Sequence, residues 1–267
     1  MTRRLATFVV ALSAAAAACR AIPAPANGVL SVSEVQLPSP GVVVGDTLRD
    51  STGQVAPLRV YAFGVGGQAD TLHDAVGQFV LLDSGAHLTG NGYLVGDSIR
   101  ASVRVVGSVG MLQTSAATVS VTPRPDSIGS ALTAAIATVA FNPLDSTATA
   151  NYSTALAANV VSMDSVPPAA VQSVVVHYAI VYQPAASVPG AASAVLVDPL
   201  GNPSTVDTTD VNGQVSRRIR VRPQAPTVAD SVVVKVTAQY RGVLLRGSPV
   251  LFVVPIQGPQ ISGSRRH

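Results

Sequence analysis

Apolar and polar residues alternate over short stretches of this chain, most clearly between positions 98 and 105. Positions 99, 101, 103 and 105 carry Ile, Ala, Val and Val, while positions 100, 102 and 104 carry Arg, Ser and Arg. Side chains of a β-strand point alternately to the two faces of a sheet. The pattern therefore predicts a strand with one buried face and one solvated face, as in antiparallel sheets.

Similar apolar stretches recur along the chain, and each ends at Gly, Pro, Asp or Ser. Val and Thr are frequent, and both fit a pleated sheet better than a helix. The 22 glycines and 19 prolines divide the chain into short pieces. The sequence therefore predicts an all-β protein. The further predicted strands cover residues 29–37, 58–63, 78–82, 111–121, 171–182, 193–197, 213–222, 232–239 and 243–254.

Residues 131–140 are rich in alanine, which favours a helix. Thr133, Ile136, Thr138 and Val139 interrupt the alanines and weaken that interpretation. We therefore assign this stretch to the first, A-type strand of a second β-domain.

Two parts of the sequence resemble each other about half a chain apart. Residues 97–104 (DSIRASVR) match residues 230–237 (DSVVVKVT), and a Gly-x-Leu triplet follows each at 110–112 and 242–244. This separation suits a duplicated domain. Pro123 and Pro125 lie where no apolar pattern crosses, so we place a linker at residues 123–130. The predicted domains cover residues 29–122 and 131–256, and residues 257–267 are expected to form a disordered tail.

The N-terminus has the composition of an export signal. Arg3 and Arg4 precede an uncharged run over residues 5–18, which ends in small residues before the only cysteine, Cys19. This segment resembles a bacterial lipoprotein signal peptide (1–19), which implies lipidation of Cys19. Ala16 departs from the Leu, Val or Ile usual in that pattern, so cleavage by an ordinary signal peptidase after Ala18, Ala21 or Ala26 stays open. A helix of fourteen residues is about 21 Å long. The hydrocarbon core of a membrane is about 30 Å thick, so a retained transmembrane helix is a weak alternative.

Residues 20–28 carry two prolines and are expected to form an extended tether behind the anchor. The formal charge of +3 includes Arg3 and Arg4, and without them 15 basic residues face 14 acidic ones. This near balance gives no reason to expect a nucleic-acid partner. With one cysteine, no intrachain disulfide is possible, so buried apolar surface must stabilise the fold.

Two turns in the second half follow a recognisable pattern. Residues 198–203 read DPLGNP and residues 209–215 read TDVNGQV. Asn-Gly and Gly-Asn tolerate positive φ, and an Asp accepts hydrogen bonds within its own turn. Residues 165–256 thereby resemble bacterial Ig-like domains of the invasin and intimin type. In the first half the similarity is limited to residues 50–55 (DSTGQV). The resemblance implies two tandem Ig-like β-sandwiches with Greek-key connections, used as spacers or adhesive modules.

Motifs of catalysis and metal binding are missing from the sequence. The histidines, at positions 73, 87, 177 and 267, form no pair at metal-ligand spacing. Neither a nucleophile elbow nor a phosphate-binding loop is present, and Gly64–Gly67 is best interpreted as a loop. We expect no catalytic residues, metal or cofactor. A calcium site at Asp198, Asp207 and Asp210 is a minor alternative to simple turn formation.

The most concentrated charge lies at residues 217–222. Arg218, Arg220 and Arg222 share one face of a predicted strand and are a possible binding site for an acidic polysaccharide or phosphate groups. The simpler interpretation is a solvated face that protects the sheet from aggregation.

Together these features predict a non-enzymatic cell-envelope lipoprotein that acts as a structural, adhesive or spacer module. The alternative is a carbohydrate- or ligand-binding surface module that uses the arginine-rich strand, and a hydrolase is a third hypothesis. The expected partners are the membrane, through the N-terminal lipid, and a surface protein or polysaccharide. The expected location is the outer membrane or cell surface, or otherwise the periplasm or the medium.

Overall fold

The computed structural model describes residues 29–64, 69–70, 77–90, 92–132, 136–142, 144–145, 147, 150–185, 193–222 and 230–257. The predicted signal peptide with Cys19, the tether and residues 258–267 lie outside the described residues. The described residues form strands and turns and contain no helix, so the all-β prediction is confirmed. Among them, no helix of membrane-spanning length and hydrophobicity is found.

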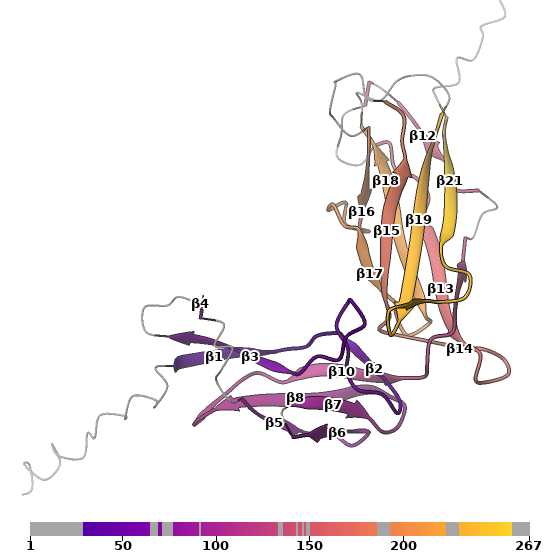
Figure 1. The fold of residues 1–267 in the computed structure, drawn as a ribbon. Helices are drawn as coiled ribbons and strands as arrows, with labels where there is room; N and C mark the ends of the chain where they lie inside the picture. Colours follow the sequence, from indigo (N-terminus) through magenta and orange to yellow (C-terminus); the bar gives the residue numbers. More distant parts are fainter. Residues whose placement is uncertain are drawn as a thin grey trace, which may run out of the picture.

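The strands before residue 123 form the N-terminal sandwich (Figure 1). One sheet has the order β1 (Val29–Gln36), β3 (Arg59–Gly64), β4 (Ala69–Asp70). The facing sheet has the order β2 (Gly41–Val43), β10 (Ala117–Thr122), β8 (Arg100–Val109), β5 (Gln78–Leu81), and β9 (Leu112–Gln113) also pairs with β8. A separate hairpin joins β6 (Ala86–Thr89) to β7 (Tyr93–Gly96).

The strands after residue 126 form the C-terminal sandwich. One sheet has the order β11 (Ser127–Ser130), β13 (Leu156–Ser162), β18 (Gln214–Val221), β16 (Ala194–Val197), and β14 (Ala169–Ala170) also pairs with β13. The facing sheet has the order β12 (Val139–Ala140), β21 (Val250–Gln257), β19 (Asp230–Tyr240), β15 (Val175–Tyr182), β17 (Val206–Thr208), with β20 (Val243–Leu244) on β19.

The strand order of the C-terminal sandwich is that of an Ig domain. Strands β11, β13, β18 and β16 correspond to A, B, E and D, and β21, β19 and β15 correspond to G, F and C. The N-terminal sandwich repeats this order in β2–β10–β8–β5 and in the β1–β3 pair. The prediction of two tandem Ig-like sandwiches is therefore confirmed.

The predicted sequence repeat corresponds to equivalent strands. Strands β8 and β19 hold the same place in their sheets, and each turns back into a short strand, β9 or β20. Both turns use a glycine in the left-handed region, Gly110 with φ 60° and Gly242 with φ 74°. Glycine adopts this conformation without the steric cost that a Cβ imposes.

Each sandwich has its own apolar core, built from the inward positions of the alternating strands. Val103 and Val105 on β8 are fully buried and Arg104 is exposed, as the alternation predicts. However, Ile99 and Ala101, expected on the buried face, are exposed. The N-terminal clusters involve residues between 32 and 121, and the C-terminal cluster involves residues between 128 and 256. Tyr178, the largest fully buried side chain, donates its hydroxyl to the carbonyl of Leu156 at 3.2 Å.

Two expectations for the segment between the sandwiches are wrong. Residues 127–130, predicted as linker, form β11 and pair with β13. Residues 131–140 do not form one strand, because the chain leaves the first sheet after Ser130 and enters the second as β12 at Val139. Residues 133–135 of that stretch lie outside the described residues. Both strands are too short to show an alternating pattern in the sequence.

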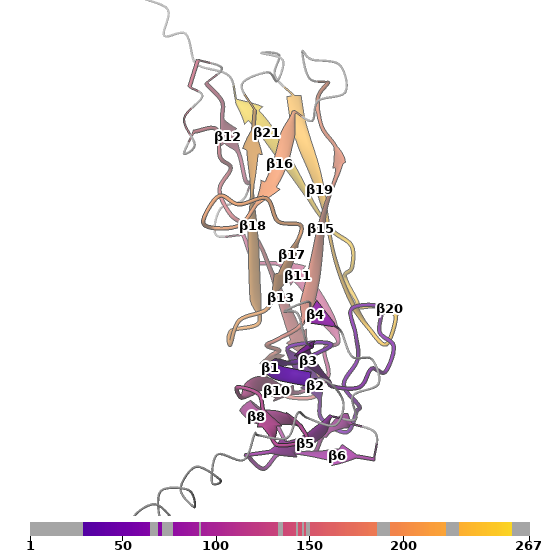
Figure 2. The same ribbon diagram turned by 90° about the vertical axis from the view of Figure 1, so that its left-hand side faces the viewer.

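Figure 1 shows the two sandwiches joined in a bent arrangement, with the N-terminal sandwich lying across the lower end of the C-terminal one. Figure 2, turned by 90°, shows the β19–β20 end of the C-terminal sandwich next to the N-terminal sandwich. The contact between them is the most elaborate polar site in the described part of the chain.

Candidate functional site

The junction between the sandwiches centres on Asp46, which follows β2. Gly45 turns the chain with φ 75°, and the Asp46 amide donates to the carbonyl of Val43 at 3.0 Å. The amide of Gly96 donates to the Asp46 carbonyl at 3.1 Å, which fixes the residue against β7. The Asp46 side chain is only 7% exposed, so its charge needs partners inside the protein.

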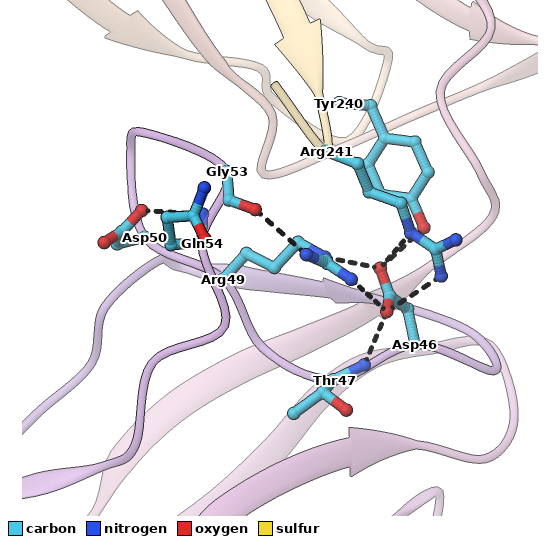
Figure 3. A network of polar contacts seen from close by, with 8 residues as sticks. All are labelled: Asp46, Thr47, Arg49, Asp50, Gly53, Gln54, Tyr240 and Arg241. Carbon is cyan, nitrogen blue, oxygen red and sulfur yellow. Dashed lines mark hydrogen bonds and ion pairs between the residues drawn. The ribbon is translucent and has the colours of Figure 1, made fainter. Parts of the chain in front are cut away.

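Both sandwiches supply those partners (Figure 3). From the N-terminal sandwich, Arg49 donates Nε and Nη2 to the Asp46 carboxylate at 2.9 and 3.0 Å, and the Thr47 amide donates at 2.9 Å. From the end of β19, the Tyr240 hydroxyl donates at 2.7 Å. Arg241 donates Nε at 3.0 Å and places Nη2 at 2.9 Å. One carboxylate therefore holds two arginines, one from each sandwich.

These contacts set the ionisation of the group. Burial alone raises the pKa of Asp46, but the hydrogen bonds from Arg49, Arg241 and Tyr240 outweigh it and hold the pKa well below its ordinary value. Burial and the bond to Asp46 raise the pKa of Tyr240 to about 12. At neutral pH, Asp46 is thus an anion and Tyr240 a neutral donor.

A second contact involves the turn at Asp50. Gln239 Nε2 donates to the carbonyl of Ser51 at 3.0 Å. Gly53 packs so closely on the β19–β20 turn that a Cβ there would overlap the backbone nitrogen of Gly242. Arg49 Nη1 donates to the Gly53 carbonyl at 2.9 Å, which links this turn to the Asp46 cluster. A side chain at position 53 is therefore incompatible with the observed packing.

A third contact joins Ser120 on β10 to Ser173, which precedes β15. Their hydroxyls lie 2.6 Å apart, and Ser173 adopts φ 63°. A Cβ at Gly41 would lie 2.7 Å from the Ser173 Cβ. With the Asp46 cluster and the Asp50 turn, this contact makes three fixed points between the sandwiches.

The cleft between these contacts has a volume of only about 90 Å³. Pockets for small molecules usually measure about 300–1,000 Å³. His177 lines this cleft with Val42 and Thr122. This cleft thus leaves little room for a ligand, whereas a second, open cleft of about 780 Å³ at the junction is lined by Val43 and Ile99 of one sandwich and by Arg241 and Leu244 of the other.

The turns at Asp50, Asp198 and Asp210 have the same geometry. In each, one carboxylate oxygen accepts the amides two and four residues later, at 2.8–3.0 Å. The glycine at the fourth position has positive φ, 84° at Gly53, 90° at Gly201 and 72° at Gly213. The turn interpretation of these aspartates is therefore confirmed, including the turn in the first half.

The arginine-rich strand is β18, and it divides its arginines between the two faces. Arg217 points inward, is 7% exposed and forms an ion pair with Asp207 at 2.8 Å. Arg218 and Arg222 are exposed on the opposite face. Arg220 lies between them, donates to the Thr147 carbonyl at 3.0 Å and stacks 5.7 Å above the Tyr152 ring.

Groups that could bind metal are not gathered anywhere in the described residues, where no three His, Cys, Asp or Glu side chains lie together. The aspartates of the calcium alternative have other roles: Asp198 and Asp210 close turns, and Asp207 pairs with Arg217. His87 contacts Asp97 at 2.7 Å on the exposed β6–β7 hairpin. His73, His267 and Cys19 lie outside the described residues.

Sequence reasoning missed the Asp46 junction. Asp46 and Tyr240 are 194 positions apart, and neither belongs to a repeated or recognisable motif. The only local signal was Gly45 before Asp46, which indicates a turn and gives no partner.

Comparison with known proteins gives a few distant similarities. No family model matches the chain, and no curated protein matches it. An InvE adhesin structure from Yersinia pseudotuberculosis is 12% identical with a TM-score of 0.36, covering 86% of this chain and 61% of the adhesin. Domains 4 and 5 of the S-layer protein SbsC are 11% identical with a TM-score of 0.30, covering 85% and 98% of the two chains. Mouse cadherin-23 EC22-24 is 12% identical with a TM-score of 0.26, covering 86% and 64%.

This chain therefore spans about three fifths of the adhesin chain. Similarities at this level assign no function.

Proposed function

We propose that this protein is a non-enzymatic structural or adhesive module of the bacterial cell envelope, in which two Ig-like sandwiches act as a bent spacer of fixed geometry. The observation that carries the proposal is the buried Asp46 carboxylate, which binds Arg49 from one sandwich and Tyr240 and Arg241 from the other. If the two sandwiches moved freely about a flexible linker, the Asp46 carboxylate would be exposed to water.

The energetics favour a fixed junction. Hydrogen bonds to a charged group contribute about 1.5–3 kcal/mol each. Separation of the sandwiches would expose the Asp46 carboxylate and remove the donors from Tyr240 and Arg241. The Ser120–Ser173 and Ser51–Gln239 bonds join the sandwiches at two further points and oppose rotation about the Asp46 cluster. A spacer needs this property, because it must keep its two ends at a constant separation and angle.

The fixed geometry is tested by distance measurement between spin labels. The labels are placed through Glu34→Cys on β1 and Gln257→Cys at the end of β21, in a Cys19→Ser background; both sites are exposed. We expect a single narrow distance distribution by double electron–electron resonance. Adding Tyr240→Phe and Arg241→Ala should broaden it, whereas Arg246→Ala, an exposed arginine on the same sandwich, should not. A broad distribution in the starting protein would contradict the spacer.

The envelope location is tested through Cys19. Lipidation of Cys19 would place the protein in the membrane fraction and make its processing sensitive to globomycin. Cys19→Ser should move the protein into the soluble fraction. Equal membrane association of both proteins, with no effect of the drug, would remove the lipid anchor from the proposal and leave the spacer itself to the distance measurement.

A further inference from the structure

We propose that the outer face of strand β18 is a binding site for a linear anionic polysaccharide, contacted by Arg218, Arg220 and Arg222. The proposal concerns a surface of the C-terminal sandwich that takes no part in the junction. The polysaccharide site is therefore tested independently of the spacer function.

The first observation is the distribution of charge. Five arginines of the described residues form ion pairs with aspartates: Arg49, Arg104, Arg124, Arg217 and Arg241. Within the same described residues, Arg218, Arg220 and Arg222 form none. No acidic residue occurs in β11, β13, β16 or β18, the strands of this sheet. The outer face of the sheet thus carries three positive charges with no opposing charge on its strands.

The second observation is the linear arrangement of the cations. Alternate residues of a strand point to the same face, and each residue advances about 3.3 Å. Arg222 directly follows β18, and its amide donates to the Ser193 carbonyl beside β16, so the three arginines form a row about 13 Å long. Strands β16 and β13 run beside β18, with Val197 opposite Arg218 and Val195 opposite Arg220. A row of cations along a strand matches an extended chain that carries an anionic group on successive sugars.

The third observation is that one arginine is held in place. Arg220 donates to the Thr147 carbonyl and lies over the Tyr152 ring, so its guanidinium loses little conformational freedom on binding. A planar guanidinium presents paired donors to carboxylate, sulfate or phosphate oxygens. Arg218 and Arg222 are exposed on either side of Arg220, and their charge attracts the anionic polysaccharide from solution.

The surroundings favour a polysaccharide over a lipid surface. Proteins that lie on membranes insert large apolar side chains beside their cations. None of the exposed large hydrophobic side chains among the described residues lies on β13, β16 or β18. The strands beneath the β18 row therefore offer charge and no exposed large apolar side chain to a bilayer, and the exposed Leu144 and Leu200 lie in the adjoining loops.

The test uses heparin, a linear sulfated polysaccharide, as the probe in isothermal titration calorimetry with the purified protein. We expect binding that weakens as salt rises, and no binding to neutral dextran. Arg218→Ser with Arg222→Ser should weaken heparin binding by about tenfold or more. Arg220 is left in place because it also contacts Thr147 and Tyr152.

A matched control separates this row from net charge. Arg59→Ser with Arg246→Ser removes the same charge from exposed positions on other strands and turns, and should leave heparin affinity within about twofold of the starting protein. Circular dichroism checks that both double variants stay folded. The proposal is overturned if the starting protein ignores heparin, or if both variants lose affinity equally. It is also overturned if the β18 variant loses only binding to phosphatidylglycerol vesicles, since the site would then recognise a lipid surface.

Discussion

At the scale of single residues, Asp46 shows how one buried charge joins two domains. Its carboxylate is almost fully enclosed, yet five side-chain donors and a backbone amide reach it. A buried ion is costly unless it is paired and hydrogen-bonded. Tyr240 and Arg241 therefore have to stay beside Asp46, and this holds the C-terminal sandwich in a fixed position on the N-terminal one.

Replacement of Asp46 by Asn tests this role. The amide would leave Arg49 and Arg241 facing a neutral group, and we expect a loss of about 2–3 kcal/mol in the free energy of unfolding, measured by urea denaturation. Asp83→Asn is the matched control, because Asp83 pairs with the half-exposed Arg104 within one sandwich. The control should lose less than Asp46→Asn does, because exposed ion pairs contribute little to stability. Equal losses in both variants would show that Asp46 has no special role.

The same residue predicts a pH dependence. The pKa of Asp46 is lower in the folded protein than in the unfolded chain, where it is near 3.8. Its stabilisation is therefore complete above about pH 5 and is lost as the pH falls below that unfolded value. We expect the unfolding free energy of the starting protein to fall more steeply between pH 5 and pH 2 than that of Asp46→Asn. Parallel pH profiles of the two proteins would refute this assignment.

At the scale of elements, one turn design serves two purposes. The turns at Asp50, Asp198 and Asp210 share their hydrogen bonds and their left-handed glycine. Only the Asp50 turn also contacts the other sandwich, through Ser51 and Gly53. The Asp50 turn thus both reverses the chain and forms part of the interface between the sandwiches.

A pair of glycine substitutions separates these purposes. Gly53→Ala and Gly201→Ala both place a Cβ at positive φ, at a cost of about 1–2 kcal/mol. Only Gly53→Ala also meets the other sandwich at Gly242, whereas Gly201→Ala meets the Tyr152 hydroxyl at 3.0 Å within its own domain. We expect Gly53→Ala alone to broaden the spin-label distance distribution between the sandwiches. A comparable broadening in Gly201→Ala would argue against the contact at Gly53.

The elements also show where sequence patterns are sufficient. Strands such as β8 and β18, with several inward Val or Ile residues, follow directly from alternation. The three aspartate turns follow from local chemistry, because the backbone hydrogen bonds that each Asp carboxylate accepts come from residues two and four positions later. Strands β11 and β12 were missed, since four residues and two residues carry too short a pattern, and β13 was missed although its seven residues alternate between buried and half-buried positions. The pairing of β11 and β12 is decided by the partner strands β13 and β21.

At the scale of the whole molecule, the arrangement of the sandwiches could not be predicted. The duplication indicated two similar domains, but their contact depends on residues that the duplication does not share. In the aligned sequences Arg241 corresponds to Val109 and Tyr240 to Ser108, and in the paired hairpins Tyr240 takes the place of Val109 and Arg241 that of Gly110. The junction therefore arose from differences between the repeats, whereas the alignment of the repeats shows only what they have in common.

The parallel pairing of the outer strands has a mechanical consequence. Strand β2 runs parallel to β10, and β12 runs parallel to β21. When the two ends of the chain are pulled apart, each parallel pair is loaded in shear, and its hydrogen bonds must break together. The hydrogen bonds of a strand pair that is peeled apart from one end break one after another. In each sandwich this pair joins a strand near the start of the domain to a strand at its end. Both sandwiches therefore resist a tensile force through the same kind of strand pair.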